Sequence, residues 1–295
     1  MEQTVLTVLV VPAALFTVMV GLGLSLTVDD FRRVVHDRKV LGVGLIGQMA
    51  LLPVLGALIV ICFRLEPVFG LGLMVLALSP GGALSNAVVH VVRGELALSI
   101  SLTAISSIVT PVTIPVLYRL SASYLTPETE TVSLPIGKTM LQLFLICIVP
   151  VALGMAVRKG WPTFAIRADK PVRVLSVVFF VIVIGGVIKQ HLGIYPVGFR
   201  SVGPAVLALN LGSLTLGFVG ARLARLNFEQ AATIAIEVGM QNAATATFVT
   251  ATLLGDTTMA IVPAIYATVM LPSALIFGVA AGSMRRNATV LHASR

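Results

Sequence analysis

Long apolar runs of about twenty residues, each bounded by polar or charged residues, make up most of the chain. A run of ~20 apolar residues is long enough to cross the hydrocarbon core of a bilayer as a helix. No run alternates apolar and polar residues with a period of two, so helices are expected rather than the strands of a membrane barrel. The pattern predicts an all-α polytopic membrane protein with nine transmembrane helices, at residues 4–27, 40–63, 68–92, 96–118, 140–157, 172–188, 201–221, 230–254 and 258–283.

The basic residues lie between these runs and give the bundle an orientation. With the N-terminus outside, fifteen of the twenty Lys and Arg residues fall in inside loops. Since Lys and Arg are retained on the cytoplasmic side of a membrane, we predict an outside N-terminus and a cytoplasmic C-terminus. This distribution accounts for the net charge of +8 without nucleic acid as a partner, because no basic soluble module is evident.

Two of the predicted spans contain residues that interrupt a helix. The third span contains Pro80-Gly81-Gly82, which removes a backbone donor and adds backbone freedom. The eighth contains Gly239 close to Glu237 and two amides. Each stands second from last in its half of the chain, and interrupted helices in corresponding positions are typical of a transporter site between inverted repeats. We predict a first repeat of four spans at 1–118, an external linker at 119–138, a second repeat of five spans at 139–284 and a cytoplasmic tail at 285–295.

Glu237 is the only one of the twelve acidic residues that falls deep inside a predicted span. A carboxylate within the hydrocarbon layer is costly, so it is expected to face protein or water and to have a function. A protonated, neutral Glu237 that donates one hydrogen bond is the alternative.

Oxygen-bearing side chains accompany both interruptions, and such oxygens are the ligands that hard cations prefer. Ser99 and Thr103 stand four residues apart, hence on one helical face, and the short turn at Gly94 brings that face toward the first break. Read singly, such hydroxyls more often bond to their own helix or help helices pack. The full set consists of Gln48, Ser85, Asn86, Ser99, Thr103, Glu237 and Gln241.

These residues give the chain a resemblance to the bile acid:sodium symporter family over essentially its whole length. The resemblance rests on Pro80-Gly81-Gly82 before Ser85-Asn86, on Arg93-Gly94 before Ala97-Leu98-Ser99 and Thr103, and on Glu237 with Gly239, Gln241 and Asn242. It implies a core domain and a panel domain, with the third and eighth spans as two crossed, discontinuous helices of the core. It also implies the nine-span form, which lacks a leading helix.

Carried over by position, the resemblance implies two sodium sites that share Glu237. The first would use Ser85, Asn86, Ser99, Thr103 and Glu237, and the second would use Gln48, Glu237, Gln241 and the backbone oxygens of Val238 and Met240. Asn242 would face the substrate cavity. Ala83 stands where many members carry a hydroxyl residue near the substrate, so the substrate contacts differ from the common set.

We therefore predict a sodium-coupled symporter that imports an organic anion by alternating access. The anion would be a bile-acid-like compound, a sulfated conjugate or a small carboxylate. The chain would lie in the plasma membrane, a bacterial inner membrane, with no cofactor besides the coupling Na⁺ and no obligate protein partner. A proton-coupled or efflux carrier of the same fold, with Glu237 as the proton site, is the alternative. An intramembrane enzyme is a remote one, because no His-Glu-x-x-His, Gly-x-Ser-x-Gly or intramembrane Asp pair occurs.

Overall fold

The computed structural model describes residues 5–30, 38–125, 135–193 and 195–293, and these parts of the chain are almost entirely helical. The first half contains α1 (Val11–Ser25), α3 (Arg38–Ile46), α4 (Leu52–Cys62), α5 (Pro67–Leu78), α6 (Ala83–Val91) and α7 (Leu96–Leu125). The second half contains α8 (Ile136–Leu143), α9 (Val149–Gly160), α10 (Pro162–Gln190), α11 (Tyr195–Leu223), α12 (Phe228–Gly239), α13 (Ala243–Thr247) and α14 (Ile261–Ala293).

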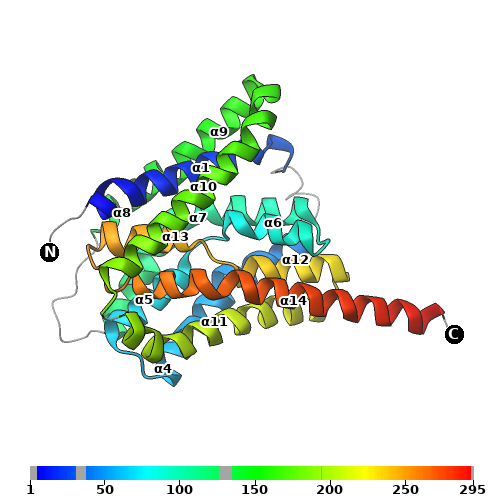
Figure 1. Ribbon diagram of the computed structural model, residues 1–295. Helices are drawn as coiled ribbons and strands as arrows, with labels where there is room; N and C mark the ends of the chain where they lie inside the picture. The colour runs from blue at the N-terminus through cyan, green and yellow to red at the C-terminus, as the bar shows by residue number, and fades with distance from the viewer. Residues whose placement is uncertain (1–4, 31–37, 126–134, 194, 294–295) are drawn as a thin grey trace.

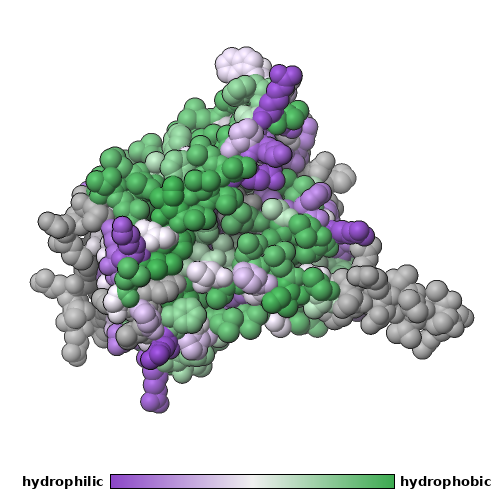
Figure 2. Space-filling view, in the orientation of Figure 1, coloured by the Kyte–Doolittle hydropathy of each residue, from purple (hydrophilic) through white to green (hydrophobic). Residues whose placement is uncertain are grey.

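Within the described residues, seven uninterrupted helical stretches are long and apolar enough to cross a membrane. They are Leu6–Ser25, Arg38–Cys62, Leu96–Leu125, Ile136–Gly160, Pro162–Gln190, Gly198–Leu223 and Ile261–Ala281. Shorter apolar helices lie at Pro67–Leu78 and Ala243–Leu253. Figure 2 shows apolar residues covering the middle of the visible face, with hydrophilic residues near the ends of the helices. These findings confirm an all-helical polytopic membrane protein.

Several of the long helices contain a widened π-helical turn just before a proline. These turns are Leu6–Val10, Gly47–Leu51 and Phe144–Ile148, and Pro12, Pro53 and Pro150 follow each of them by two places. A proline ring clashes with the carbonyl group four residues earlier, and a wider turn relieves that clash. The predicted ligand Gln48 lies within the second of these turns.

Two groups of helices pack around the interrupted elements (Figure 1). Helices α1, α9 and α10 contact one another, and α4, α5, α11, α12 and α14 form a second set of contacts. The contact between α1 and α9 is close, because a Cβ atom on Gly23 would lie 2.2 Å from the carbonyl oxygen of Val151. Small residues at helix interfaces permit such approach where no hydrophobic force drives helices together.

The two interruptions meet in the middle of the molecule. Helix α5 ends at Leu78 and α6 begins at Ala83, while α12 ends at Gly239 and α13 begins at Ala243. The amide of Gly82 donates to the carbonyl oxygen of Met240 at 2.9 Å, and the amide of Asn242 donates to that of Pro80 at 2.8 Å. Backbone groups that the breaks release from their helices are thus paired across the two breaks, as buried backbone groups require.

Some helices extend beyond the predicted spans. Helix α10 begins at Pro162, ten residues before the predicted boundary at 172, so the predicted inside loop is largely helical. The apolar pattern marks only the part of a helix that suits the bilayer core, whereas Pro162 favours a helix start and charged residues tolerate a helix. Likewise α7 reaches Leu125 and α8 begins at Ile136, within the predicted linker, whose residues 126–134 lie outside the described ranges. The backbone of α14 continues to Ala293, through most of the predicted tail.

Candidate ion and substrate site

Glu237 is fully buried near the end of α12 and is surrounded by hydroxyl groups from two other helices. Its Oε1 atom accepts hydrogen bonds from the hydroxyls of Ser85 on α6 and Ser99 on α7. Its Oε2 atom accepts a bond of 2.7 Å from Thr103 on α7. The carboxylate therefore has only neutral side-chain oxygens as hydrogen-bonding partners among the described residues.

The oxygen atoms around Glu237 make more close contacts with one another than the available hydroxyl protons can satisfy as hydrogen bonds. Besides the three contacts with Glu237, the Ser85 hydroxyl lies 2.7 Å from the carbonyl oxygen of Gly82, and the Ser99 hydroxyl lies 2.7 Å from Asn86 Oδ1. Five oxygen–oxygen contacts thus depend on three hydroxyl protons, because each hydroxyl donates once. A small hard cation satisfies such surplus oxygen acceptors, and a single carboxylate among neutral oxygens suits a monovalent ion.

The turn between α6 and α7 places Ser99 and Thr103 against α12. Arg93 adopts a left-handed backbone conformation with φ 58°, and the amide of Gly94 donates to the carbonyl oxygen of Val89 at 2.9 Å. The next amide, of Glu95, donates to the hydroxyl of Thr233 on α12 at 2.7 Å. A Cβ atom on Gly94 would lie 2.6 Å from that hydroxyl, so glycine permits this approach. All five residues predicted for the first sodium site are thereby in one cluster.

The residues predicted for the second sodium site are buried nearby, with a less complete set of contacts. Neither amide atom of Gln48 has a hydrogen-bond partner among the described residues, and neither does Oε1 of Gln241. The Gln241 Nε2 atom donates to the carbonyl oxygen of Val238 at 2.7 Å, and the carbonyl oxygen of Met240 accepts from Gly82. Buried amide oxygens without partners fit a cation, and this second site stays a prediction.

Gly81 lies between the two predicted ion sites. A Cβ atom on Gly81 would lie 2.7 Å from Glu237 Oε2, 3.2 Å from Gln48 Nε2 and 3.3 Å from Thr103 Oγ1. Any side chain at position 81 would therefore occupy space between the carboxylate, the Gln48 amide and the Thr103 hydroxyl. Glycine is required here by this close approach rather than by its backbone angles, which other residues can adopt.

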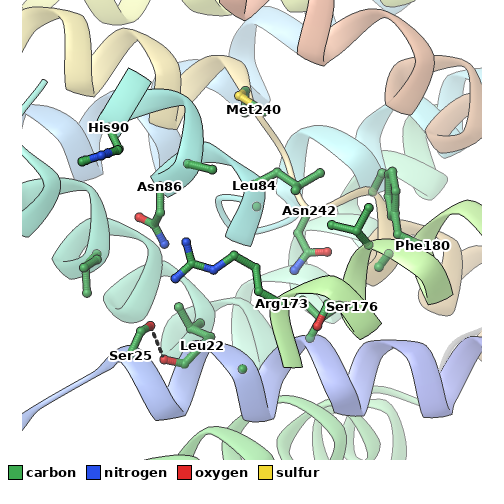
Figure 3. A pocket seen from close by; sticks show the side chains of 18 of the residues that line it. Leu22, Ser25, Leu84, Asn86, His90, Arg173, Ser176, Phe180, Met240 and Asn242 are labelled. Atoms are coloured by element: carbon green, nitrogen blue, oxygen red, sulfur yellow. Dashed lines mark hydrogen bonds between the residues drawn. The ribbon is translucent and has the colours of Figure 1, made fainter. Parts of the chain in front are cut away.

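A cavity of about 480 Å³ opens beside the crossing of the two breaks (Figure 3). Its walls come from α1, α10, α6 and the start of α7, and its polar or charged lining includes Asn86, His90, Asp169, Arg173, Gln241 and Asn242. Most other lining residues are apolar. Its volume lies in the range of small-molecule sites, roughly 300–1,000 Å³. Asn242 is among the lining residues, and its contact with substrate stays a prediction. The side chain of Ala83 lies outside the described part of the structure.

Two charged lining residues were not predicted from the sequence. Asp169 and Arg173 lie four residues apart on α10, with Arg173 Nη2 donating to Asp169 Oδ2 at 2.6 Å. The apolar pattern placed Asp169 in an inside loop and Arg173 at the inner end of the span at 172–188, where it counted among the basic residues that set orientation. The four-residue spacing of opposite charges was the available signal, but it also marks ordinary surface pairs.

A separate polar network supports the end of α12 from behind. The carbonyl oxygen of Gly239 accepts hydrogen bonds from Asn210 Nδ2 at 2.8 Å and from the Tyr266 hydroxyl at 2.7 Å. The Ser273 hydroxyl donates to Asn210 Oδ1. The buried Asn210 side chain is thus satisfied by contacts within the protein.

Comparison with known proteins identifies the family. A model of the sodium bile acid symporter family matches residues 12–194, more than half of the chain. The matched range includes α5 to α7 and ends before Glu237.

Relatives come from bacteria, plants and animals. The chain is 27% identical over 226 residues to the uncharacterized sodium-dependent transporter YocS of Bacillus subtilis, covering 76% of this chain and 68% of the relative. It is 28% identical over 248 residues to the ileal sodium/bile acid cotransporter of Oryctolagus cuniculus, covering 81% and 67%. It is 29% identical over 236 residues to the probable sodium/metabolite cotransporter BASS2, chloroplastic, of Oryza sativa, covering 78% of this chain but 55% of that relative.

The chain thus spans about two thirds of the bacterial and animal relatives and about half of the plant one. The family match covers 183 of the 295 residues, from 12 to 194. The chain therefore belongs to the sodium bile acid symporter family, a family of sodium-dependent solute transporters of the membrane and not of enzymes.

Proposed function

We propose that this chain is a sodium-coupled symporter that imports an organic anion by alternating access. The observation that carries the proposal is the proton shortage around Glu237, where five oxygen contacts depend on three hydroxyl protons. A bound Na⁺ would supply the missing positive charge. The site lies where the two broken helices pair through their backbones, so ion binding would stabilise that pairing.

We propose nine membrane spans, two of which are the interrupted pairs α5–α6 and α12–α13. The spans formed by α1, by α8 with α9, and by α10 would then belong to a panel domain, and the remaining helices would form a core of two inverted repeats. Extensive contacts of α1 with α9 and α10 support this division. The cavity lies between α1 and α10 on one side and the breaks on the other, where relative movement of the two domains would open and close it.

Two sodium ions that share Glu237 would leave this region with a net charge near +1. Ser85, Asn86, Ser99 and Thr103 would complete the first site with Glu237. The second site would use Gln48, Gln241 and Glu237 with the carbonyl oxygens of Val238 and Met240. Helix α6 begins at the cavity, and the positive end of its dipole would also favour an anion. Asn242 would contact the substrate.

The cavity would open to the cytoplasm in this conformation. Its lining includes the C-terminal end of α1, the N-terminal half of α10 and the α6–α7 end of the bundle. The loops at these ends carry the basic residues that mark the inner face, under an outside N-terminus and a cytoplasmic C-terminus. The conformation is then the one that releases substrate inward, in the inner membrane of a bacterium.

Uptake by purified protein in liposomes tests this function. The full chain is reconstituted, an inward sodium gradient is applied, and uptake of radiolabelled taurocholate and phenylacetate is compared with uptake under a potassium gradient. Glu237→Ala removes the carboxylate and is expected to abolish sodium-dependent uptake, with Glu229→Ala in the first turn of α12 as control. Normal sodium-dependent uptake by Glu237→Ala would contradict the proposal.

The alternative is a proton-coupled or efflux carrier of the same fold. In that mechanism Glu237 would carry a proton, and the surrounding hydroxyls would exchange hydrogen bonds with it. A pH gradient without sodium would then drive transport as well as the sodium gradient does. Three neutral hydroxyl oxygens contact the carboxylate, and two further oxygens contact those hydroxyls; this set favours an ion over a proton, because a proton needs only one acceptor.

A further inference from the structure

Arg173 is a cation in the cavity wall that neither predicted sodium site nor the fold requires. It extends from α10 into the pocket, and Figure 3 shows its guanidinium group reaching toward Asn86, with Asn242 on the opposite break. Its side chain is 57% exposed, so it is accessible from the cavity. Its neighbour Asp169 is on the same helix, and exposed pairs of this kind contribute little to stability. A pair held so weakly can exchange partners when an anion enters.

The other charged or titratable lining residues set the electrostatic balance. Among the described residues that line the cavity, these are His90 on α6 and the Asp169–Arg173 pair on α10. The pair has no net charge, and its carboxylate is positioned to weaken, not abolish, the attraction of Arg173 for an anion. A guanidinium group binds carboxylate, sulfate or sulfonate through two parallel hydrogen bonds, so its charge comes with a preferred geometry.

A second donor lies beside the same cavity, at the break between α12 and α13. Asn242 is 5% exposed, and its Nδ2 atom has no hydrogen-bond partner among the described residues. Its Oδ1 atom is fixed, because it accepts a hydrogen bond of 3.0 Å from the amide of Thr245 and so caps the following helix. This cap leaves the amide nitrogen as the only donor that Asn242 can offer, and a buried donor without a partner favours a ligand acceptor.

We propose that Arg173 and Asn242 form an anion subsite that selects a single anionic group carried on an apolar body. The apolar residues that line the rest of the cavity would receive that body, whereas a second charge would be placed against them at high cost. Asp169 tunes the subsite by competing for Arg173. The inference rests on the proposed transport function and adds a residue and a charge class to it.

The test is a thermal-shift titration of the purified full chain in sodium chloride and in choline chloride. Two probe series vary charge on a constant body: phenylacetamide, phenylacetate and phenylsuccinate, and the uncharged amide of glycocholate, glycocholate and glycocholate 3-sulfate. In wild type, a monoanion is expected to stabilise the protein in sodium. The neutral probe gives no sodium-dependent shift, and the dianion gives a weaker one.

Variants of α10 identify the group responsible. Arg173→Gln is expected to raise the concentration for the half-maximal monoanion shift roughly tenfold, in line with the loss of a charged hydrogen bond at an exposed site. Arg173→Lys keeps the charge without the planar fork and is expected to be intermediate. Asp169→Asn releases Arg173 and is expected to lower the midpoint several-fold. Arg167→Gln changes an exposed arginine of α10 outside the cavity lining and is the matched control.

The stabilisation by sodium alone separates this inference from the proposed function. If sodium does not stabilise wild type, the coupling proposal fails. If sodium stabilises wild type and Arg173→Gln equally, the variant is folded with its ion sites intact. If wild type and Arg173→Gln then require the same monoanion concentration for a half-maximal thermal shift, the Arg173 inference is overturned and the coupling proposal is not. The inference is also overturned if no monoanion in either probe series shifts the melting temperature. Loss of the sodium shift in Arg173→Gln would also overturn it, by placing Arg173 in the fold or the ion site.

Discussion

The side chain of Asn242 has two proposed roles, as a helix cap and as a hydrogen-bond donor to substrate. Replacing its amide nitrogen with oxygen separates them. Its oxygen caps the helix that begins at Ala243, while its nitrogen has no hydrogen-bond partner in the part of the chain that the structure describes. Asn242→Asp keeps an acceptor for the Thr245 amide and replaces the donor by a charged oxygen. The variant is expected to keep its thermal stability within a few degrees and to lose at least tenfold in affinity for an organic anion, measured by the sodium-dependent shift with phenylacetate.

Asn227 provides the control, because it is also an N-cap whose side chain accepts from a backbone amide, that of Gln230 at 2.8 Å. It begins α12 away from the cavity lining. Asn227→Asp is expected to leave the phenylacetate midpoint unchanged. Unchanged anion affinity in Asn242→Asp would show that its amide nitrogen does not face the substrate.

The contrast between Glu237 and Arg173 shows which site residues can be predicted from sequence. Glu237 could be identified because a carboxylate among apolar neighbours has no ordinary explanation. Arg173 could not be identified in this way. Basic residues are common at the ends of spans, and their effect on membrane orientation already explains their presence. Whether Arg173 points into a cavity depends on how α10 packs on α1, which no local pattern specifies.

At the scale of elements, the break after α5 needs glycine because side chains from three other helices lie close to it. Gly81→Ala introduces a methyl group 2.7 Å from Glu237 Oε2, and the buried neighbours can yield little. Sodium-dependent stabilisation is expected to be lost or to require at least tenfold more sodium. The measurement is a sodium titration followed by thermal shift.

Gly185→Ala on α10 is the matched control, since a Cβ atom there meets nothing within 4 Å. It is expected to keep the wild-type sodium midpoint and to be slightly more stable, because alanine favours a helix over glycine by ~1 kcal/mol. A normal sodium midpoint in Gly81→Ala would contradict the placement of an ion next to Gly81.

The end of α12 depends on donors supplied by other helices. Asn210→Leu removes one of the two donors to the carbonyl oxygen of Gly239 and leaves the Ser273 hydroxyl without its acceptor on Asn210. The expected cost is about 1–3 kcal/mol of stability, measured as a lower melting temperature in the absence of ligands. A second effect, weaker sodium binding, is expected because Gly239 is only two residues from Glu237.

Elements were predictable to the extent that they carry strong local signals. Pro80 with two glycines predicts a break, and the structure has α5 end two residues before it. The start of α10 at Pro162 was missed, because charged residues are read as loop although they continue a helix beyond the bilayer. The widened turn that contains Gln48 was also missed, since its cause, Pro53, lies five residues further along.

For the whole molecule, the side on which the cavity opens is a testable property. Ser25 lies at the end of α1 and lines the cavity. In a background without Cys62 and Cys147, Ser25→Cys is expected to react with a membrane-impermeant thiol reagent in inside-out vesicles and not in right-side-out ones. Tyr124→Cys, at an 80% exposed position near the opposite end of the bundle, is expected to show the reverse pattern. The same sidedness for both residues would contradict the orientation.

The arrangement of the helices was predictable only through the family resemblance. The apolar pattern counts and locates helices, but nearly identical apolar surfaces do not specify which helices touch. The backbone hydrogen bond between Gly82 and Met240 also leaves no signal in the sequence, because nearly every residue provides an amide and a carbonyl group. The residues of the oxygen cluster could be predicted from the sequence. The excess of oxygen contacts over hydroxyl protons could not, because it depends on the distances between these side chains in the fold.

The pairing of the two breaks also has a consequence for the order in which the chain can fold. The carbonyl oxygen of Pro80 and the amide of Gly82 find their partners on Asn242 and Met240, at the far end of the sequence. During synthesis the first broken helix must therefore wait in the membrane, its released groups unsatisfied, until α7 to α12 have been inserted. In detergent, a truncated chain that ends before α12 should exchange the amide hydrogen atoms near residues 79–82 faster than the full chain does.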